Sequence, residues 1–244
     1  MENAQLVSLS RQIALQQQMD VVANNMANLN TAGFKSEDML FAPYKMPVAA
    51  DNDFAGDQSV DYTQDWATIH DMQNGAIEET GNPLDVALSG PGFLTVSTPS
   101  GNRYTRDGAL AIDNSGTLVD LNGNPVLTNS GPIHFDPDDT DVSIAKDGTV
   151  STSQGIKGKL TIAEFTDPQQ LSREGNNLWS GGTPKANTTT QLLQGSIEQS
   201  NVSGVTEMAQ MIRVQRAYQQ MADLMSKQDT LRTTAVQKLG SLNA

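Results

Sequence analysis

The sequence predicts an α+β protein whose N- and C-terminal helices pair as a coiled coil, with an antiparallel β domain inserted between them. Both ends of the chain are almost free of helix breakers: residues 2–29 contain no proline or glycine, and residues 205–242 contain only Gly240. The middle, from about residue 82 to 198, instead has short alternating runs separated by turn-forming residues. Strands repeated about every 8–12 residues with no helix between them indicate an antiparallel barrel-like domain or a folded sheet.

These signals divide the chain into four regions. We expect an N-terminal helix in residues 1–34, an acidic extended arm in 35–79, an all-β domain in 80–198 and a C-terminal helix in 199–244.

The N-terminal helix is expected to be apolar on two sides. Leu6, Leu9 and Ile13 form a first stripe at helical spacing, and a second stripe contains Leu15, Met19, Val22, Met26 and Leu29. At about 100° per residue the two stripes lie on roughly opposite faces, so the helix needs partners on two sides. We therefore expect both ends of the chain to order fully only when neighbouring subunits cover the second faces.

The C-terminal helix shows one longer seam. Its apolar positions are spaced alternately by three and four residues and include Met211, Val214, Tyr218, Met221, Met225 and Leu239, while Leu224 and Leu231 widen the stripe. A seam kept over four heptads is typical of a coiled coil. The alternative is one amphipathic helix packed on a globular core, but apolar helices at both ends favour mutual pairing.

The arm and the β domain differ in composition. Residues 36–79 have ten acidic side chains and one basic side chain, Lys45, which indicates an exposed, irregular arm with short strands. Farther along, "VSIAKDGTVST" predicts a hairpin closed at Lys146-Asp147-Gly148, because Asp-Gly favours the positive φ of a tight turn.

Composition excludes several classes of function. The net charge of −13 argues against binding nucleic acid or an anionic membrane surface. No stretch is apolar for long enough to span a bilayer, so we expect no membrane insertion. The absence of cysteine excludes disulfides and thiolate metal sites. No basic start followed by an apolar run is present, so we expect export, if it occurs, without a cleaved signal peptide.

Motifs for chemistry are weak. The acidic run "DPDDTD" at residues 136–141 lacks the glycine and distal glutamate of an EF-hand, so an acidic turn is the better interpretation. "GPGFLT" at 90–95 lacks the third glycine of a dinucleotide loop. Two histidines are too few for a His-based zinc site. We assign no catalytic, cofactor-binding or metal-binding residue, although paired carboxylates for glycoside cleavage stay open in so acidic a chain.

Three segments resemble the bacterial flagellar rod and hook proteins. "ANNMANLNTAGFK" at 23–35 is similar to the family's Asn-rich N-terminal signature. The central block carries D-V-A, G-x-G-F and Y-T-R-x-G elements at 85–87, 90–93 and 104–108. "GSIEQSNVSGVTEMAQMIRVQRAYQQM", from residue 195, is similar to the C-terminal entry of the family. The match covers both ends and the centre in family order.

The resemblance implies a non-enzymatic structural subunit that assembles helically into the torque-transmitting rod across the periplasm. Its partners would be copies of itself, other rod proteins and the flagellar type III export apparatus. Length and the short acidic arm are most similar to a proximal rod subunit. A distal rod subunit is the close alternative, and a periplasmic carbohydrate-binding or carbohydrate-active protein is the alternative from another class.

The resemblance also implies roles for residues of the N-terminal motif. Asn24 and Asn28, one turn apart, are expected to make intersubunit or interhelix hydrogen bonds, since amides can be buried there without the desolvation penalty of charges. The alternative is that these amides only fray the end of the helix. Gly33 would then let the chain leave the helix, and Phe34 would anchor the exit. Together with the apolar stripes, these residues form the expected assembly interface.

Overall fold

The computed structural model describes residues 2–47, 59–187 and 189–241. The chain divides into two compact units: unit 1 comprises residues 1–26, 37–69 and 203–244, and unit 2 comprises residues 27–36 and 70–202. Two terminal helices enclose a β-rich middle in the order of the chain. The predicted α+β class is confirmed at this level.

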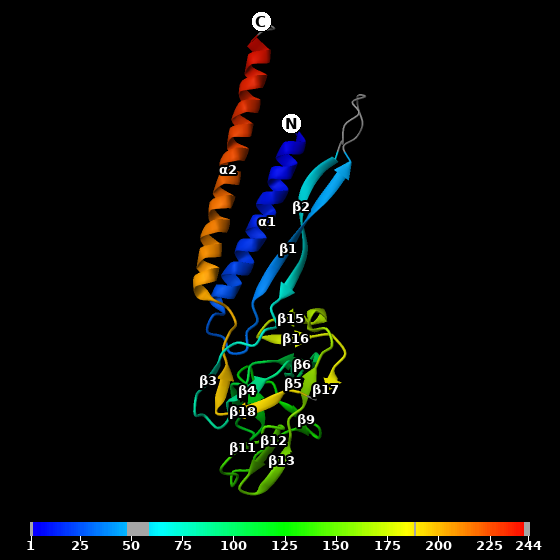
Figure 1. The fold of residues 1–244 in the computed structure, drawn as a ribbon, viewed down its shortest axis with the longest axis vertical. Helices are drawn as coiled ribbons and strands as arrows, with labels where there is room; N and C mark the ends of the chain where they lie inside the picture. The colour runs from blue at the N-terminus through cyan, green and yellow to red at the C-terminus, as the bar shows by residue number, and fades with distance from the viewer. Residues whose placement is uncertain (1, 48–58, 188, 242–244) are drawn as a thin grey trace. The chain divides into compact units, whose positions relative to one another are not determined.

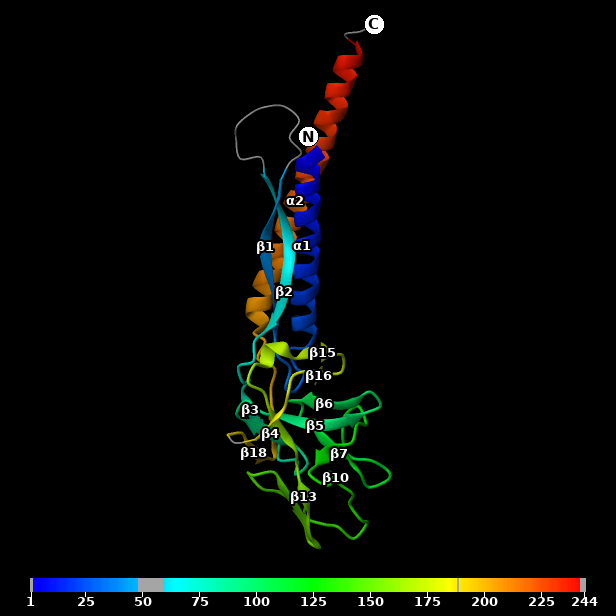
Figure 2. The same ribbon diagram turned by 90° about the vertical axis from the view of Figure 1, so that its right-hand side faces the viewer.

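Unit 1 contains a pair of antiparallel helices, α1 (Glu2–Ala27) and α2 (Gly204–Ser241). Their direction follows from two contacts. Asn25 near the end of α1 lies 3.3 Å from Glu207 in the first turn of α2, and Gln5 near the start of α1 lies 3.4 Å from Arg232. The last turns of α2 extend past the N-terminal end of α1 (Figures 1 and 2).

A two-stranded ribbon lies beside the helices of unit 1 (Figures 1 and 2). Its strands are β1 (Glu37–Pro47) and β2 (Ser59–His70), of 11 and 12 residues. The prediction of an irregular arm with short strands was therefore wrong for these residues. Main-chain hydrogen bonds build such a ribbon, so an acid-rich sequence does not prevent it. Residues 48–58 of the predicted arm lie outside the described residues.

Unit 2 is built from antiparallel sheets. The largest has six strands in the order β15-β16-β6-β5-β14-β17, so β15 and β17 are its edges. Their bounds are β15 Ser172–Glu174, β16 Leu178–Ser180, β6 Gly101–Thr105, β5 Phe93–Thr98, β14 Ile162–Glu164 and β17 Lys185–Ala186. Among the described residues this sheet is open, which fits the folded-sheet alternative.

Smaller sheets complete unit 2. The pairs are β3 (Ile77–Glu79) with β19 (Ser196–Glu198), β4 (Val86–Ser89) with β18 (Gln191–Gln194), β7 (Leu110–Ile112) with β8 (Leu118–Asp120), and β9 (Leu127–Thr128) with β10 (Gly131–Pro132). A further sheet joins β11 (Ser143–Ile144), β12 (Thr149–Thr152) and β13 (Gly155–Lys159), and a short 3₁₀ helix spans Pro168–Gln170.

The hairpin predicted at Lys146-Asp147-Gly148 is confirmed. Ile144 of β11 pairs with Val150 of β12, and Gly148 has the positive φ of +91° that the turn requires. The side chain of Asp147 accepts a hydrogen bond from the Thr149 amide at 3.1 Å and so supports the turn.

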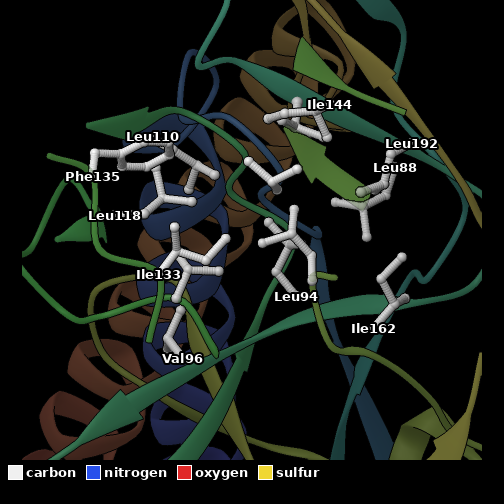
Figure 3. Packing of buried hydrophobic residues seen from close by; sticks show 14 of the residues in the cluster. Leu88, Leu94, Val96, Leu110, Leu118, Ile133, Phe135, Ile144, Ile162 and Leu192 are labelled. Atoms are coloured by element: carbon white, nitrogen blue, oxygen red, sulfur yellow. The ribbon is translucent and has the colours of Figure 1, made fainter. Parts of the chain in front are cut away.

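Two apolar clusters hold unit 2 together. The larger one collects aliphatic side chains from most of the sheets, with Leu88, Leu94, Leu118 and Leu192 fully buried (Figure 3). The smaller one surrounds Trp179 with the aromatic rings of Phe93 and Phe165. Successive strands contribute to the same clusters, so the segments that position the polar groups below are fixed by packing.

We expect Leu88→Ala to lower the free energy of unfolding by about 2–5 kcal/mol, because it leaves a cavity in the larger cluster. Leu121, which is 68% exposed, offers a matched control, and Leu121→Ala should change stability by less than about 0.5 kcal/mol. Urea unfolding followed by tryptophan fluorescence measures both. Equal losses in the two variants would contradict a closely packed core at Leu88.

Candidate functional site

A buried amide joins α1, β1 and α2 within unit 1. Asn25, on α1, is 2% exposed. Its Nδ2 donates to the Glu37 carbonyl at 2.8 Å, and its Oδ1 accepts from the Glu37 amide at 2.9 Å, so the side chain pairs with β1 as a neighbouring strand would. The same Nδ2 lies 3.3 Å from Oε1 of Glu207 on α2. Burial raises the pKa of Glu207, and the hydrogen bond from Asn25 opposes this shift.

Sequence reasoning selected Asn24 and Asn28 and missed Asn25. Asn24 is exposed, while Asn28 accepts a hydrogen bond from Thr31 in the turn that follows α1, at 3.1 Å. Their contacts with other subunits stay a prediction. Position could have identified Asn25, because it lies three residues after Val22 on the face that becomes covered.

One apolar stripe of α1 is covered within unit 1. Val22 is 1% exposed, and Leu15, Met19 and Met26 are half-buried. The facing seam of α2 is covered in the same way: Val214 is 5% exposed, and Met211, Tyr218, Met221 and Met225 are half-buried. Leu15 and Val214 line one crevice in unit 1. Leu29, the last residue of this stripe, lies in unit 2 and is half-buried there.

The other stripe of α1 stays uncovered. Leu6, Leu9 and Ile13 are 50%, 45% and 51% exposed. The predicted residues Leu224, Leu231 and Leu239 of α2 are also exposed, together with four apolar residues that the sequence analysis did not select: Val205, Met208, Ile212 and Val236. Unit 1 therefore presents large apolar side chains to solvent along both helices.

Gly33 and Phe34 lie in unit 2 and start the return of the chain. Gly33 has φ +66°, and a Cβ there would lie 2.3 Å from the carbonyl carbon of Arg106, so any side chain would collide with the main chain. Phe34 is 3% exposed, and the guanidinium carbon of Arg173 lies 3.9 Å from the centre of its ring. Both residues lie in the segment that follows α1, and their part in assembly stays a prediction.

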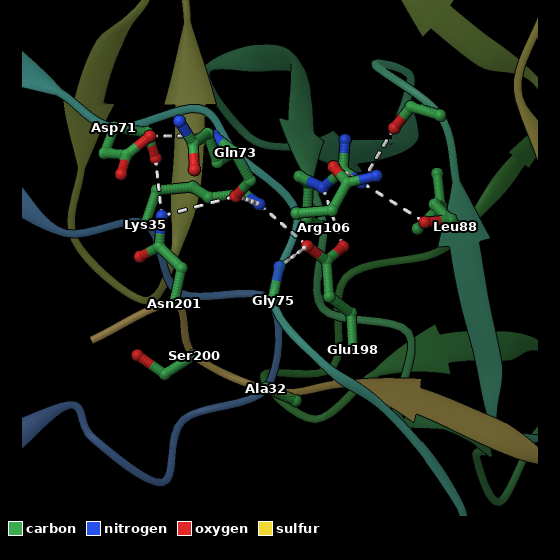
Figure 4. Close-up of polar contacts among 12 residues, drawn as sticks. Ala32, Lys35, Asp71, Gln73, Gly75, Leu88, Arg106, Glu198, Ser200 and Asn201 are labelled. Carbon is green, nitrogen blue, oxygen red and sulfur yellow. Dashed lines mark hydrogen bonds and ion pairs between the residues drawn. The ribbon is translucent and has the colours of Figure 1, made fainter. Parts of the chain in front are cut away.

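A buried ion cluster lies next to this turn (Figure 4). Glu198 is fully buried, and its Oε1 lies 2.7 Å from the ammonium of Lys35, while its Oε2 lies 2.8 Å from Nε of Arg106. The amide of Gly75 donates to Oε1 at 2.9 Å. Lys35 also donates to the carbonyl of Gln73 at 2.6 Å. The carboxylate is therefore neutralised and hydrogen-bonded, as a buried charge must be.

Arg106 uses its remaining donors on the main chain between β4 and β5. It donates to the carbonyls of Gly92, Gly90 and Leu88 at 2.8, 2.9 and 3.2 Å (Figure 4). A side-chain oxygen of Asn74 accepts a further bond at 3.0 Å. The planar guanidinium thus fixes the shape of the β4–β5 turn while it pairs with Glu198.

Two buried ionisable groups in unit 2 have pKa values shifted by their burial. Burial lowers the pKa of Lys35, with Arg106 acting in the same direction and Glu198 opposing. Burial also raises the pKa of Asp107 to about 6, and the carboxylates of Asp120 and Asp85 add to this shift.

Asn201 binds together the segments by which the chain passes between the units. Its Oδ1 accepts from the Ser36 amide at 2.7 Å, and its Nδ2 donates to the Asp71 carbonyl at 2.8 Å. The Asp71 amide also donates to the Ser36 carbonyl at 2.9 Å. The chain passes between the units four times, and within unit 2 the residues next to the last three passages are therefore joined directly.

The acidic run at 136–141 is held by a lysine. Lys157 Nζ lies 2.5 Å from Asp139 and 3.1 Å from Asp136. The hydrogen bonds from Lys157 and Thr152 lower the pKa of Asp139 to about 2. In the part of the chain that the structure describes, no three acidic or histidine side chains are grouped so that they could hold a metal ion. Neither described helix has the length and apolar character needed to cross a bilayer.

Comparison with known proteins identifies the family to which the chain belongs. Residues 6–35 match the profile of the flagella basal body rod protein, residues 87–152 that of the flagellar hook protein FlgE/F/G D1 domain, and residues 193–238 that of the flagellar basal body rod FlgEFG protein C-terminal. The chain belongs to this flagellar family and is a structural subunit of the basal-body rod.

Full-length relatives make the assignment more specific. The chain is 37% identical to flagellar basal-body rod protein FlgF of Caulobacter vibrioides and 32% identical to FlgF of Mesorhizobium japonicum, covering at least 99% of each chain. It is also 34% identical to flagellar basal-body rod protein FlgG of Buchnera aphidicola, over 94% of this chain and 95% of the relative. The chain is thus a rod protein with most similarity to FlgF.

The buried cluster takes one charged residue from each of the three matched segments. Lys35 ends the first, Arg106 lies in the second and Glu198 lies in the third. All three segments were recognised as motifs in the sequence, but no role was predicted for Lys35, Arg106 or Glu198. The available signal was a charged residue inside an otherwise apolar or strand-forming run, as in "YTRDGAL" and "GSIEQ".

We expect Glu198→Gln to lower the free energy of unfolding by about 3–5 kcal/mol, since it leaves two buried cations without a counter-charge. The matched control is Glu174→Gln, which removes an ion pair of similar length with Arg103 at a carboxylate that is 46% exposed. That change should cost much less, because an exposed ion pair contributes little to stability. Urea unfolding at neutral pH compares them, and similar losses would contradict a special role for the buried pair.

We also expect Asp107→Asn to change how stability depends on pH. Because the folded pKa is raised from 3.8 to about 6, the folded state holds this proton more tightly than the unfolded state. The resulting stabilisation is complete below about pH 4 and is lost as the pH rises through 6. The variant, which mimics the protonated form, should match the wild type at pH 4 and exceed it by up to about 3 kcal/mol at pH 7.

Urea unfolding of both proteins between pH 4 and 7 measures this difference. The comparison with wild type removes the contributions of Asp139 and Glu164, whose pKa values are lowered to about 2 and which act in both proteins. A difference that does not vary with pH would contradict the raised pKa of Asp107.

Proposed function

We propose that this rod subunit belongs to the proximal rod and assembles helically through its two terminal helices. In this proposal α1 and α2 form the rod core as a coiled coil, and the assembly transmits torque across the periplasm. Its partners are further copies of the chain and other proximal and distal rod proteins. The boundaries at residues 34, 79 and 198 serve as the working division of these parts.

The observation that carries the proposal is the two-sided helix α1. Its stripe at Leu15, Met19 and Val22 is covered within unit 1, whereas Leu6 and Leu9 on the other stripe remain about half exposed. Full burial of such a side chain stabilises by roughly 1.5–3 kcal/mol, so covering the second stripe supplies a driving force for association. In this proposal the uncovered stripe contacts a different surface of the neighbouring subunit, so the interface is heterologous. Heterologous interfaces that do not close into a ring build helical filaments.

Export and location follow from the same proposal. A rod subunit is exported through the flagellar type III apparatus as an unfolded chain, and the absence of cysteine suits such transit because no cross-link can form on the way. The chain then functions in the basal body, in the periplasmic part of the rod, without catalysis or a cofactor.

Two alternatives remain distinct from this proposal. The similarity to FlgG supports a distal position, which differs in copy number within the rod. A carbohydrate-active protein would instead cleave peptidoglycan, and that activity would disappear on changing one particular Asp or Glu.

The test is a charge placed on the uncovered stripe. We expect Leu9→Glu to abolish incorporation into basal bodies and motility, because a carboxylate would be desolvated at the subunit contact. Leu9→Met is the matched control, since it keeps an apolar side chain of similar volume at the same position and should leave assembly intact. Mass spectrometry of purified basal bodies measures incorporation.

Circular dichroism of the purified variants should show unchanged helix content and melting, which separates failed assembly from failed folding. Incorporation of Leu9→Glu at the wild-type level would contradict an assembly role for this stripe. In the wild-type sample, a few copies per basal body support the proximal position, and a number equal to that of the distal rod protein would contradict it.

A further inference from the structure

The strand partners of two early segments in unit 2 come from one late segment, residues 190–199. Its strand β18 pairs with β4 over four residues, and β19 pairs with β3 over three. Each of these sheets has only two strands among the described residues. Both β3 and β4 therefore depend on this late segment for their strand partner.

The same segment enters the larger apolar cluster and other loops of unit 2. Leu192 is fully buried in that cluster, and its amide donates to the Lys146 carbonyl at 3.0 Å. Gln194 donates from its side chain to the carbonyls of Pro83 and Val142, each at 2.8 Å. It also accepts from the amide of Ile144 at 3.1 Å.

The earlier part of unit 2 also depends on the late segment for a buried negative charge. The fully buried carboxylate of Glu198 is the counter-ion of Lys35 and Arg106, which lie 163 and 92 residues earlier in the chain. Without it, two cations would be buried with carbonyl and amide oxygens as their remaining partners. Burying an uncompensated charge is strongly unfavourable, so this site cannot close before Glu198 arrives.

Glycines provide the space in which the late segment lies. A Cβ on Gly75 would come within 1.9 Å of the Gln199 carbonyl oxygen. At the other end of the segment, a Cβ on Gly90 or Gly92 would come within 2.7 Å of Thr190. The earlier part of unit 2 is therefore shaped to receive this segment by close main-chain approach.

We infer that residues 190–199 are the closing segment of unit 2, and that the earlier part of the chain is an acceptor which gains its native packing only when this segment is seated. The acceptor consists of the edges of β3 and β4, the three glycines and the two buried cations. A chain made or delivered from its N-terminus thus keeps unit 2 open until its last quarter is present. This inference stands on unit 2 alone and does not depend on rod assembly.

The experiment divides the full chain between acceptor and closing segment. A site for a specific protease is inserted between Thr183 and Pro184, in an exposed turn, and Trp66→Phe leaves Trp179 as the single tryptophan. The cleaved protein is unfolded, and fragments 1–183 and 184–244 are separated and mixed again. The near-ultraviolet circular dichroism of Trp179, which is fully buried in unit 2, reports native packing.

We expect fragment 1–183 alone to lack the native Trp179 signal and fragment 184–244 to restore it. Glu198→Gln in the second fragment should raise the concentration needed for half restoration by about 100-fold or more. Asp223→Asn is the matched control, because it makes the same acid-to-amide change at an exposed position of the same fragment. Its titration should match the wild type within about twofold.

A second variant tests the acceptor independently of charge. Gly75→Ala in fragment 1–183 should weaken restoration by at least about tenfold, because the added methyl group meets the Gln199 carbonyl. The inference is overturned if fragment 1–183 gives the full signal alone, if the wild-type fragments do not restore it, or if Glu198→Gln binds as well as Asp223→Asn.

Discussion

Unit 2 depends on one carboxylate held between two cations. Glu198 joins Lys35 and Arg106, and all three side chains are buried away from bulk solvent, so each charge requires the others. An apolar trio of similar volume could be as stable, but it would tolerate other registers. Ion pairs with fixed hydrogen-bond geometry accept one arrangement. The cluster therefore joins three segments that lie far apart in the sequence.

In unit 1 a single side chain, that of Asn25, makes polar contacts that position the ribbon and α2 against α1. Asn25 pairs with the main chain of Glu37 and reaches Glu207, so one amide positions the ribbon and the second helix against α1. An amide suits this position because it can donate and accept at once without carrying charge. The covered stripe then packs around Val22, while the opposite stripe with Leu9 stays available. Positioning inside the unit and the association that we propose for this subunit thus use different faces of one helix.

Much of this was predictable from local signals. The long stretches without proline or glycine predicted both helices, and the Asp-Gly turn at 147–148 predicted its hairpin, because these features act over a few residues. Two features were not predicted from the sequence. The ribbon strands β1 and β2 were missed because acidic composition hides a structure held by main-chain bonds. The pairing of Lys35 with Glu198 was missed because nothing in a single sequence links residues 163 positions apart.

Asn201 ties together chain segments that lie next to the boundaries between the two units. The chain passes between the units after residues 26, 36, 69 and 202, so four covalent connections join them. Asn201 bonds Ser36 and Asp71, and its own amide donates to the Phe34 carbonyl at 3.3 Å, so the ends of the last three connections are tied together within unit 2. Lys35 of the buried cluster is the direct neighbour of Ser36, so this hydrogen-bonded site lies beside the ion pairs with Glu198. The last three connections therefore leave unit 2 from one site that is fixed both by amide hydrogen bonds and by buried charge.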